Sequence, residues 1–191
     1  MDIKAIINES ARLKLEILAD EVMLLRIEEV IAATVNCYRN GGKTLFCGNG
    51  GSAADAQHLA AELSGRFYFD REPLDAEALH VNTSYLTAVA NDYSYNEVYA
   101  RLVSARGRKG DVIFAFSTSG NSPNIVKALE VAKKNYLVCV GFTGKKPSDM
   151  DALCDIIFKM PTADTPRIQE LHILLGHIIC QGVEETLFKR S

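Results

Sequence analysis

Residues 2–39 carry apolar side chains at intervals of three and four, with charged residues between them. This period is typical of amphipathic helices, and we expect two, with a break near Ala19 and Asp20 and an end at Gly41 and Gly42. Their apolar faces are wider than packing on one sheet needs. Two explanations carry equal weight: packing on the rest of this chain, or burial against another subunit.

From residue 43 onward, short apolar runs alternate with stretches of helical period. This alternation predicts βαβ units and a parallel sheet, whose ligands bind where the carboxyl ends of the strands meet. The expected strands are 44–47, 78–81, 111–116, 136–142 and 155–160. One helix is expected directly after Ser52, and three more over 84–90 (capped by Asn82 or Thr83), 96–106 and 124–134. A short helix is expected near 147–153. The last helix should start at an N-cap at Thr165, with Pro166 at N1, and end at about Phe188.

Length and composition place the chain among ordinary globular proteins. Its 191 residues, 48% apolar and 24% charged, fit one domain, with N-terminal helices in 1–40 and an α/β core in 41–191. A net charge of −3 argues against nucleic-acid binding. Five scattered cysteines without a C-x-x-C spacing favour reduced thiols. With no apolar run of membrane length and no signal-like N-terminus, we expect a cytoplasmic protein.

The first polar loop, Gly48-Asn49-Gly50-Gly51, follows a buried strand. Ser52 and Asp55 have the spacing of a capping box, which would start a helix behind the loop and create a cradle for an anion or a hydroxyl group. His58 and Glu62 then share one helix face, where they can bind a metal ion or move a proton. The alternative for His58 alone is a core histidine.

The second polar loop carries three consecutive hydroxyl residues after a strand and a Ser-Pro pair before a helix. Hydroxyls, backbone N–H groups and the helix N-terminus together favour a phosphate whose charge is offset by dipoles rather than by lysine. No G-K-[ST] follows, so this is not a Walker loop. The alternative is an ordinary serine-rich turn with Ser122 as N-cap. The hydroxyl residues are Ser117, Thr118, Ser119 and Ser122.

Four separated motifs occur in one order: CGNGGSAADAQHLAAELSGR, AND, STSGNS, and RIQELH followed by His177. In these the chain resembles the sugar isomerase (SIS) domain family and, within it, the phosphoheptose isomerases. The resemblance implies an α/β three-layer sandwich, with a five-stranded parallel sheet flanked by helices and an N-terminal helical extension. It implies a homotetramer with active sites between subunits. The implied reaction converts sedoheptulose 7-phosphate to D-glycero-D-manno-heptose 7-phosphate, which bacteria use for surface polysaccharide such as lipopolysaccharide.

The same resemblance implies the site residues. Glu62 and His177 are the expected acid/base pair, in an order that the sequence does not fix. Arg66 either reaches the substrate or pairs with Glu62, and Asp92 either binds a hydroxyl or forms a turn. The implied zinc ligands are His58, Glu62, Gln169 and His177. The implied substrate contacts are Asn49, Gly50, Gly51, Ser52, Glu62, Arg66, Asn91, Asp92 and Gln169 for the sugar, and Ser117, Thr118, Ser119 and Ser122 for the phosphate.

Helix geometry limits how Gln169 and His177 can meet one ion. Eight residues separate them, which is roughly 12 Å along a helix and about 80° around it. Either the helix is disturbed between them, with Gly176 as a candidate, or the two come from different subunits; we favour the second. His172 lies at another angle and is assigned to packing or a hydrogen bond, and His80 receives no catalytic role.

Two other functions remain open. A non-enzymatic SIS relative binds the bacterial replication initiator, but such a protein needs no Glu62, Gln169 or His177, all of which are present. An isomerase of another phosphosugar is the second, and loop 67–77 could shape that choice. The chain also departs from the family pattern: some members carry an acidic residue just before R-I-Q-E, where this chain has Thr165 and Pro166, with Asp164 one step earlier.

Overall fold

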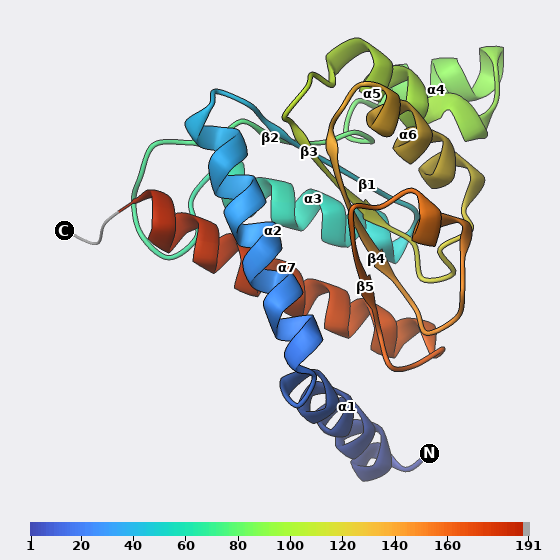
Figure 1. Cartoon of the computed structure of the whole chain (residues 1–191). Coiled ribbons are helices and arrows are strands. Elements are labelled where there is room, and N and C mark those ends of the chain that lie inside the picture. The colour runs from blue at the N-terminus through green and yellow to red at the C-terminus, as the bar shows by residue number, and fades with distance from the viewer. Residues whose placement is uncertain (189–191) are drawn as a thin grey trace.

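The computed structural model describes residues 1–188 of the chain. These residues form seven α-helices and five strands: an N-terminal pair of helices comes first, and the other five helices are distributed among the strands (Figure 1). The helices are α1 (Ile3–Leu18), α2 (Glu21–Arg39), α3 (Gly51–Ser64), α4 (Thr83–Asp92), α5 (Val98–Arg106), α6 (Pro123–Lys134) and α7 (Thr165–Leu187). The strands are β1 (Thr44–Gly48), β2 (Ala76–Ala78), β3 (Val112–Phe116), β4 (Val138–Thr143) and β5 (Ile156–Lys159), and 3-10 turns span Tyr95–Glu97 and Asp149–Ala152.

The five strands form one parallel sheet in the order β2-β1-β3-β4-β5. In a parallel sheet all carboxyl ends lie at one edge, so the loops after β1, β3 and β4 are neighbours. This order brings the glycine loop after Gly48 beside the hydroxyl loop after Phe116. The fold therefore places both polar loops at one edge.

Two apolar cores cover the two faces of the sheet. On one face, strand phenylalanines pack against α1, α2, α3 and α7, and the Phe46 and Phe114 rings stack at 4.7 Å between centroids. On the other, residues such as Ile113 pack against α4, α5 and α6. Figure 1 shows the resulting layers, with α2, α3 and α7 on one side of the sheet and α4, α5 and α6 on the other. These layers confirm the expected three-layer sandwich.

The N-terminal pair breaks where the sequence predicts. Ala19 ends α1, and the Asp20 side chain accepts a hydrogen bond from Met23 N at 3.0 Å, which caps α2. Leu13 and Ile17 are buried against the body of the protein, whereas Leu15 and Leu18 on the same helix are exposed. Part of the apolar surface therefore packs on the home chain and part does not.

Several predicted boundaries are wrong by one to three residues. The second strand is Ala76–Ala78 rather than 78–81: Leu79 N makes the last bond to β1, at Phe46 O, and a turn closed by Val81 N and Ala78 O then takes the chain away from the sheet. Helix α7 has Asp164 rather than Thr165 at its N-cap. Asn82 caps α4 through Tyr85 N, as expected.

Within residues 1–188, no helix combines the length and the apolar character that a membrane span requires. All five cysteines are free thiols.

Candidate active site

Helices α3 and α7 carry the strongest constellation of chemical groups. They lie side by side and run in the same direction, since Gln169 packs on Gly51 near both helix starts and Cys180 reaches Leu59 O further along. Gly176 permits this approach, because a Cβ there would run into the Leu59 side chain. Helix α7 is unbroken from Thr165 to Leu187, so the less favoured alternative, a helix disturbed at Gly176, is wrong.

His58, Glu62 and His177 meet on the outer surface of this helix pair. The ligand atoms of the three side chains lie within 4.8 Å of one another. The two imidazole Nε2 atoms are 2.9 Å apart, and His58 Nε2 is 3.2 Å from Glu62 Oε1. All three belong to one chain and remain partly open to solvent. The cluster thus joins the predicted acid/base pair to the predicted ligand His58.

The donor set of this cluster fits a zinc ion. Two imidazole nitrogens and a carboxylate oxygen are common zinc ligands, and three protein ligands leave a position for water or substrate. Two facing Nε2 atoms repel unless a proton or a cation lies between them. Burial and the neighbouring His58 both lower the pKa of His177, while Glu62 raises it, so His177 favours the neutral form that binds a cation.

Gln169 does not join this cluster within one chain. Its amide lies against Gly51, where a Cβ would come within 2.5 Å of Nε2. Gly51 is seven residues before His58, which is about 10 Å along the helix axis. The structure therefore brings three of the four predicted ligands together and leaves Gln169 at the start of α3.

The start of α3 differs from the predicted capping box. Gly50, with φ at +56°, is the N-cap and makes no side-chain cap, while Ser52 is buried inside the first turn. The box fails because the helix begins two residues early. Asp55 is therefore free of a capping role: its Oδ2 atom is buried without a partner, and burial raises its pKa to about 6 despite the nearby His58.

Asn49 ties the glycine loop to the neighbouring loop. Its amide exchanges two hydrogen bonds of 2.9 Å with buried Asn124 and accepts another from Tyr95 OH at 3.1 Å. Asn91 and Asp92, predicted to contact the sugar, are exposed in the last turn of α4 and bond to each other at 3.0 Å. Asn49 therefore holds the glycine loop against the start of α6.

The hydroxyl loop is internally bonded. Ser117 Oγ lies 2.9 Å from Ser122 Oγ and accepts from Gly120 N at 3.1 Å, which turns the loop back on itself. Ser122 is the N-cap residue of α6 but makes no side-chain cap bond, so its hydroxyl is not consumed by the helix. Thr118 and Ser119 face outward, into a hollow of about 350 Å³. The loop thus presents hydroxyls at a helix start, as the phosphate interpretation requires.

Two lysines on this hollow were missed by sequence reasoning. Lys145 and Lys146 line it together with Thr118, Ser119 and Asn121. They follow β4, which pairs directly with β3, so strand order alone brings them to the hydroxyl loop. The expectation that dipoles rather than lysine offset an anion here stays a prediction, and these two lysines are further candidates for that role. The only available signal was a Lys-Lys pair shortly after a predicted strand.

The remaining candidates lie apart from the cluster. His172 is fully buried and its Nε2 lies 3.2 Å from Thr143 O, which agrees with the expected hydrogen-bonding role. Burial lowers the pKa of His80, and no contact within the described chain gives it a role in the cluster. Among the described ion pairs, Glu62 pairs with His58 and not with exposed Arg66. Asp164 serves as the exposed N-cap residue of α7.

Sequence comparison connects this site to known proteins. A family profile described as SIS domain matches residues 8–144. The phosphoheptose isomerase of Aneurinibacillus thermoaerophilus is 51% identical over 189 residues, which is 99% of this chain and 96% of that protein. The chain belongs to the phosphoheptose isomerases of the SIS domain family. A Campylobacter jejuni relative named phosphoheptose isomerase 2 is 50% identical and covers 99% of this chain and 94% of its own.

Solved structures of this family have the same fold. The phosphoheptose isomerase GmhA of Neisseria gonorrhoeae superposes with a TM-score of 0.89 at 39% identity, covering 96% of this chain and 97% of that chain. A phosphoheptose isomerase of Francisella tularensis gives a TM-score of 0.91 at 32% identity, with 96% of each chain covered. Both the family and the fold that the motifs indicated are confirmed.

Proposed function

We propose that this chain interconverts sedoheptulose 7-phosphate and D-glycero-D-manno-heptose 7-phosphate, and so supplies heptose for bacterial surface polysaccharide. The observation that carries the proposal is the His58–Glu62–His177 cluster, within one chain, in a protein about half identical to named phosphoheptose isomerases over its full length. The same cluster argues against a regulator that only binds the replication initiator, because such a protein needs no acid/base pair.

Aldose–ketose interconversion removes a proton from the carbon beside a carbonyl and returns one to the neighbouring carbon through an enediol. Glu62 and His177 are the proposed base and acid, since both are partly exposed and both reach the same small volume. His58 holds Glu62 through the 3.2 Å contact and so limits its rotamers. Asp55, whose pKa is raised to about 6 by burial, lies about one turn before His58 on the same helix.

The substrate phosphate is proposed to bind at the hydroxyl loop. Ser117, Thr118, Ser119 and Ser122 supply the hydroxyls, and the start of α6 adds the positive end of a helix. Lys145 and Lys146 add cations on the same hollow. Asn49, Gly50, Gly51, Ser52, Arg66, Asn91, Asp92 and Gln169 are the proposed contacts of the sugar.

A zinc ion is proposed on His58, Glu62 and His177, with Gln169 from another subunit as the fourth ligand. When bound, zinc would polarise the carbonyl and hydroxyl oxygens at which charge develops. Two observations support a homotetramer with shared sites. Gln169 lies away from the cluster of its own chain, and α1 has exposed apolar residues that another subunit could cover. Five free thiols fit the reducing cytoplasm.

The test is incubation of the purified protein with sedoheptulose 7-phosphate, with and without chelator and added zinc, followed by chromatography of the products. We expect aldose to form, and a chelator to reduce its rate. Glu62→Gln should lower kcat by about 100-fold or more, because it removes the proposed proton carrier. Glu28→Gln on the exposed face of α2 is the control and should keep the wild-type rate. Absence of aldose under every condition would refute the proposal.

A further inference from the structure

A buried ion pair outside the proposed chemistry joins α7 to the segment after α3. Arg71 Nε lies 2.8 Å from Glu184 Oε1, and the two side chains are only 1% and 0% exposed. Glu184 lies two turns after His177 on α7, so it shares the face that packs on α3. The attraction between two buried charges must first offset the cost of removing both from water, so such a pair is a weak source of stability. Its place in the fold calls for another explanation.

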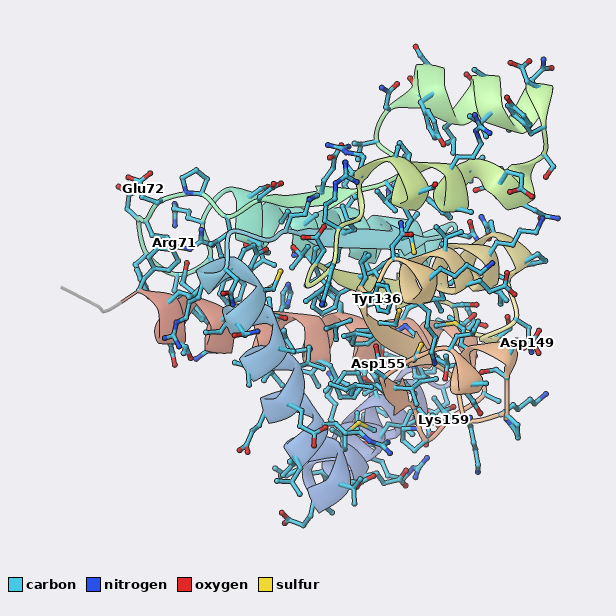
Figure 2. The ribbon with its side chains drawn as sticks, turned by 45° about the horizontal axis from the view of Figure 1, so that its top comes forward. Arg71, Glu72, Tyr136, Asp149, Asp155 and Lys159 are labelled. Carbon is cyan, nitrogen blue, oxygen red and sulfur yellow. The ribbon has the colours of Figure 1, made fainter. Side chains whose placement is uncertain are left out.

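Arg71 fastens the end of the helix that carries Glu62. Its Nη2 donates to Glu62 O at 2.9 Å, and Nη1 donates to Leu63 O at 3.0 Å. The last carbonyl groups of a helix have no partner within it, and here one guanidinium satisfies them. Figure 2 shows Arg71 where the 65–72 segment closes over the C-terminal part of α7. The backbone of Glu62 is thus tied directly to the ion pair.

Glu184 fastens the segment that covers His177. Its Oε1 accepts from Phe67 N at 3.0 Å and its Oε2 from Tyr68 N at 2.8 Å. Phe67, held by this bond, packs on the His177 ring, with 5.7 Å between centroids. Burial acts to raise the pKa of Glu184, but these two N–H donors and Arg71 together lower it, so the carboxylate stays charged.

We propose that Arg71 and Glu184 are positioning residues that set the geometry between Glu62 and His177. One rigid unit holds the backbone of the first residue and the aromatic neighbour of the second. A guanidinium suits this role, because its planar fork reaches the carboxylate and the helix carbonyls at once. The inference rests on the proposed isomerase function, in which Glu62 and His177 act together.

The test compares Arg71→Lys and Glu184→Gln with the wild type. Lysine keeps the charge but cannot bridge Glu184 and both carbonyls; glutamine keeps the shape but loses the charge and one acceptor. Loss of such supporting groups typically weakens metal binding or activity about 10- to 100-fold. Calorimetric titration of zinc into each metal-free protein should give a Kd that is higher by this factor in the two variants than in the wild type. We expect kcat to fall by a similar factor. KM for the phosphosugar should change less than about threefold, because the hydroxyl loop is untouched.

Asp111→Asn is the matched control. Asp111 is also buried, accepts from Lys43 N at 3.0 Å and Arg108 N at 2.8 Å, and pairs with Lys43 Nζ at 2.9 Å. These partners lie in the loops before β1 and β3, so the same chemistry serves another part of the fold. We expect Asp111→Asn to lower the melting temperature while the zinc Kd and kcat stay at wild-type values. Folded Arg71 and Glu184 variants that behave like this control would overturn the inference.

Phe67→Leu gives a second and milder test, which decides the matter if the ion-pair variants do not fold. It removes the ring from His177 while leaving Arg71 and Glu184 in place. A raised zinc Kd and a lower kcat are expected, and wild-type values for both would contradict the proposal. If the proposed isomerase function were wrong, the result would be different. The wild type would then form no aldose, but the zinc Kd of the Arg71 and Glu184 variants would still differ from that of Asp111→Asn.

Discussion

His172 illustrates how one residue can tie the stability of this protein to pH. The side chain is fully buried between the Phe116 and Phe142 rings, and its Nδ1 has no partner within the described chain. Burial lowers its pKa to about 4, although the bond to Thr143 O opposes this. The unfolded chain, with a pKa of about 6.5, binds a proton that the folded state excludes. His172 therefore costs stability as the pH falls from 6.5 towards 4.

This sign leads to a measurable prediction. Between pH 7 and pH 5, His172 should remove about 2 kcal/mol of unfolding free energy from the wild type. His172→Gln keeps a donor for Thr143 O but does not titrate. Between pH 7 and pH 5 the unfolding free energy of this variant should therefore fall by about 2 kcal/mol less than that of the wild type. Urea unfolding at both pH values gives the difference, in which other titrating groups cancel. Equal losses in the two proteins would show that His172 does not titrate on unfolding.

Gly51 shows how a missing side chain can serve a site. Its φ lies outside the left-handed region, yet an alanine Cβ would sit 2.5 Å from Gln169 Nε2. Gly51→Ala should displace Gln169 and lower kcat about 10-fold or more, since small misplacements are costly in catalysis. If Gly51→Ala acts through Gln169, the double variant Gly51→Ala with Gln169→Ala should lose no more kcat than the more damaging of the two single variants. Additive losses in kcat would instead show independent effects.

Local spacing limits how much of the site can be predicted from the sequence. His58 and Glu62 are four apart, so their shared face follows from helix geometry alone. Their meeting with His177 depends on how α3 packs on α7, and the position of Lys145 and Lys146 beside the hydroxyl loop depends on β3 pairing with β4. Neither contact is encoded within one segment of the chain. Motif resemblance supplied His177, whereas no motif pointed to the lysines.

At the scale of elements, the turn after α6 carries a conformational cost. Tyr136 has φ at +59° and is exposed, and its neighbour Leu137 N bonds to Ala132 O while Tyr136 N bonds to Lys133 O. These two bonds form a Schellman motif, whose left-handed residue is usually glycine. Tyrosine pays a steric cost at that position that glycine avoids.

Tyr136→Gly should therefore stabilise the protein by about 0.5–1 kcal/mol, after the greater freedom of glycine in the unfolded chain is subtracted. Melting temperatures at one protein concentration measure the effect. Asn135→Gly is the control: Asn135 has φ at −89°, so glycine relieves nothing there and should lower the melting temperature. A lower melting temperature for Tyr136→Gly would mean that the exposed ring makes contacts that outweigh the strain.

The period of the apolar residues predicted which elements form, but not where they end. The break after α1 was predictable because Asp20 is a good N-cap. The start of α3 was not, because Gly50 displaced a well-spaced Ser52 and Asp55. The short strand β2 shifted because it pairs on one side only and its end is set by the turn at Leu79. Tertiary contacts decide such boundaries.

At the scale of the whole molecule, α1 projects beyond the sheet (Figure 1) and carries an exposed apolar stripe. Leu15 and Leu18 are 63% and 64% exposed, and Val22 and Leu25 extend exposed apolar surface onto α2. Contiguous apolar surface of this kind marks interaction sites. In the proposed homotetramer a second copy of the chain would cover this surface, because Gln169 needs the cluster of a neighbouring chain to complete the proposed ligand set.

Adding charge to this stripe should therefore dissociate the protein and inactivate it together. Leu15→Lys with Leu18→Lys preserves helix propensity but places two ammonium groups in the proposed interface, where each costs several kcal/mol to desolvate. Light scattering should show a tetramer for the wild type and a smaller species for the double variant, with a fall in kcat. Glu130→Lys, at an exposed position of α6, changes the net charge equally and should leave both unchanged. A double variant that keeps its mass would exclude the stripe as an interface. One that dissociates but keeps full activity would show that each chain holds a complete site, and Gln169 would then have to act where it lies, against Gly51.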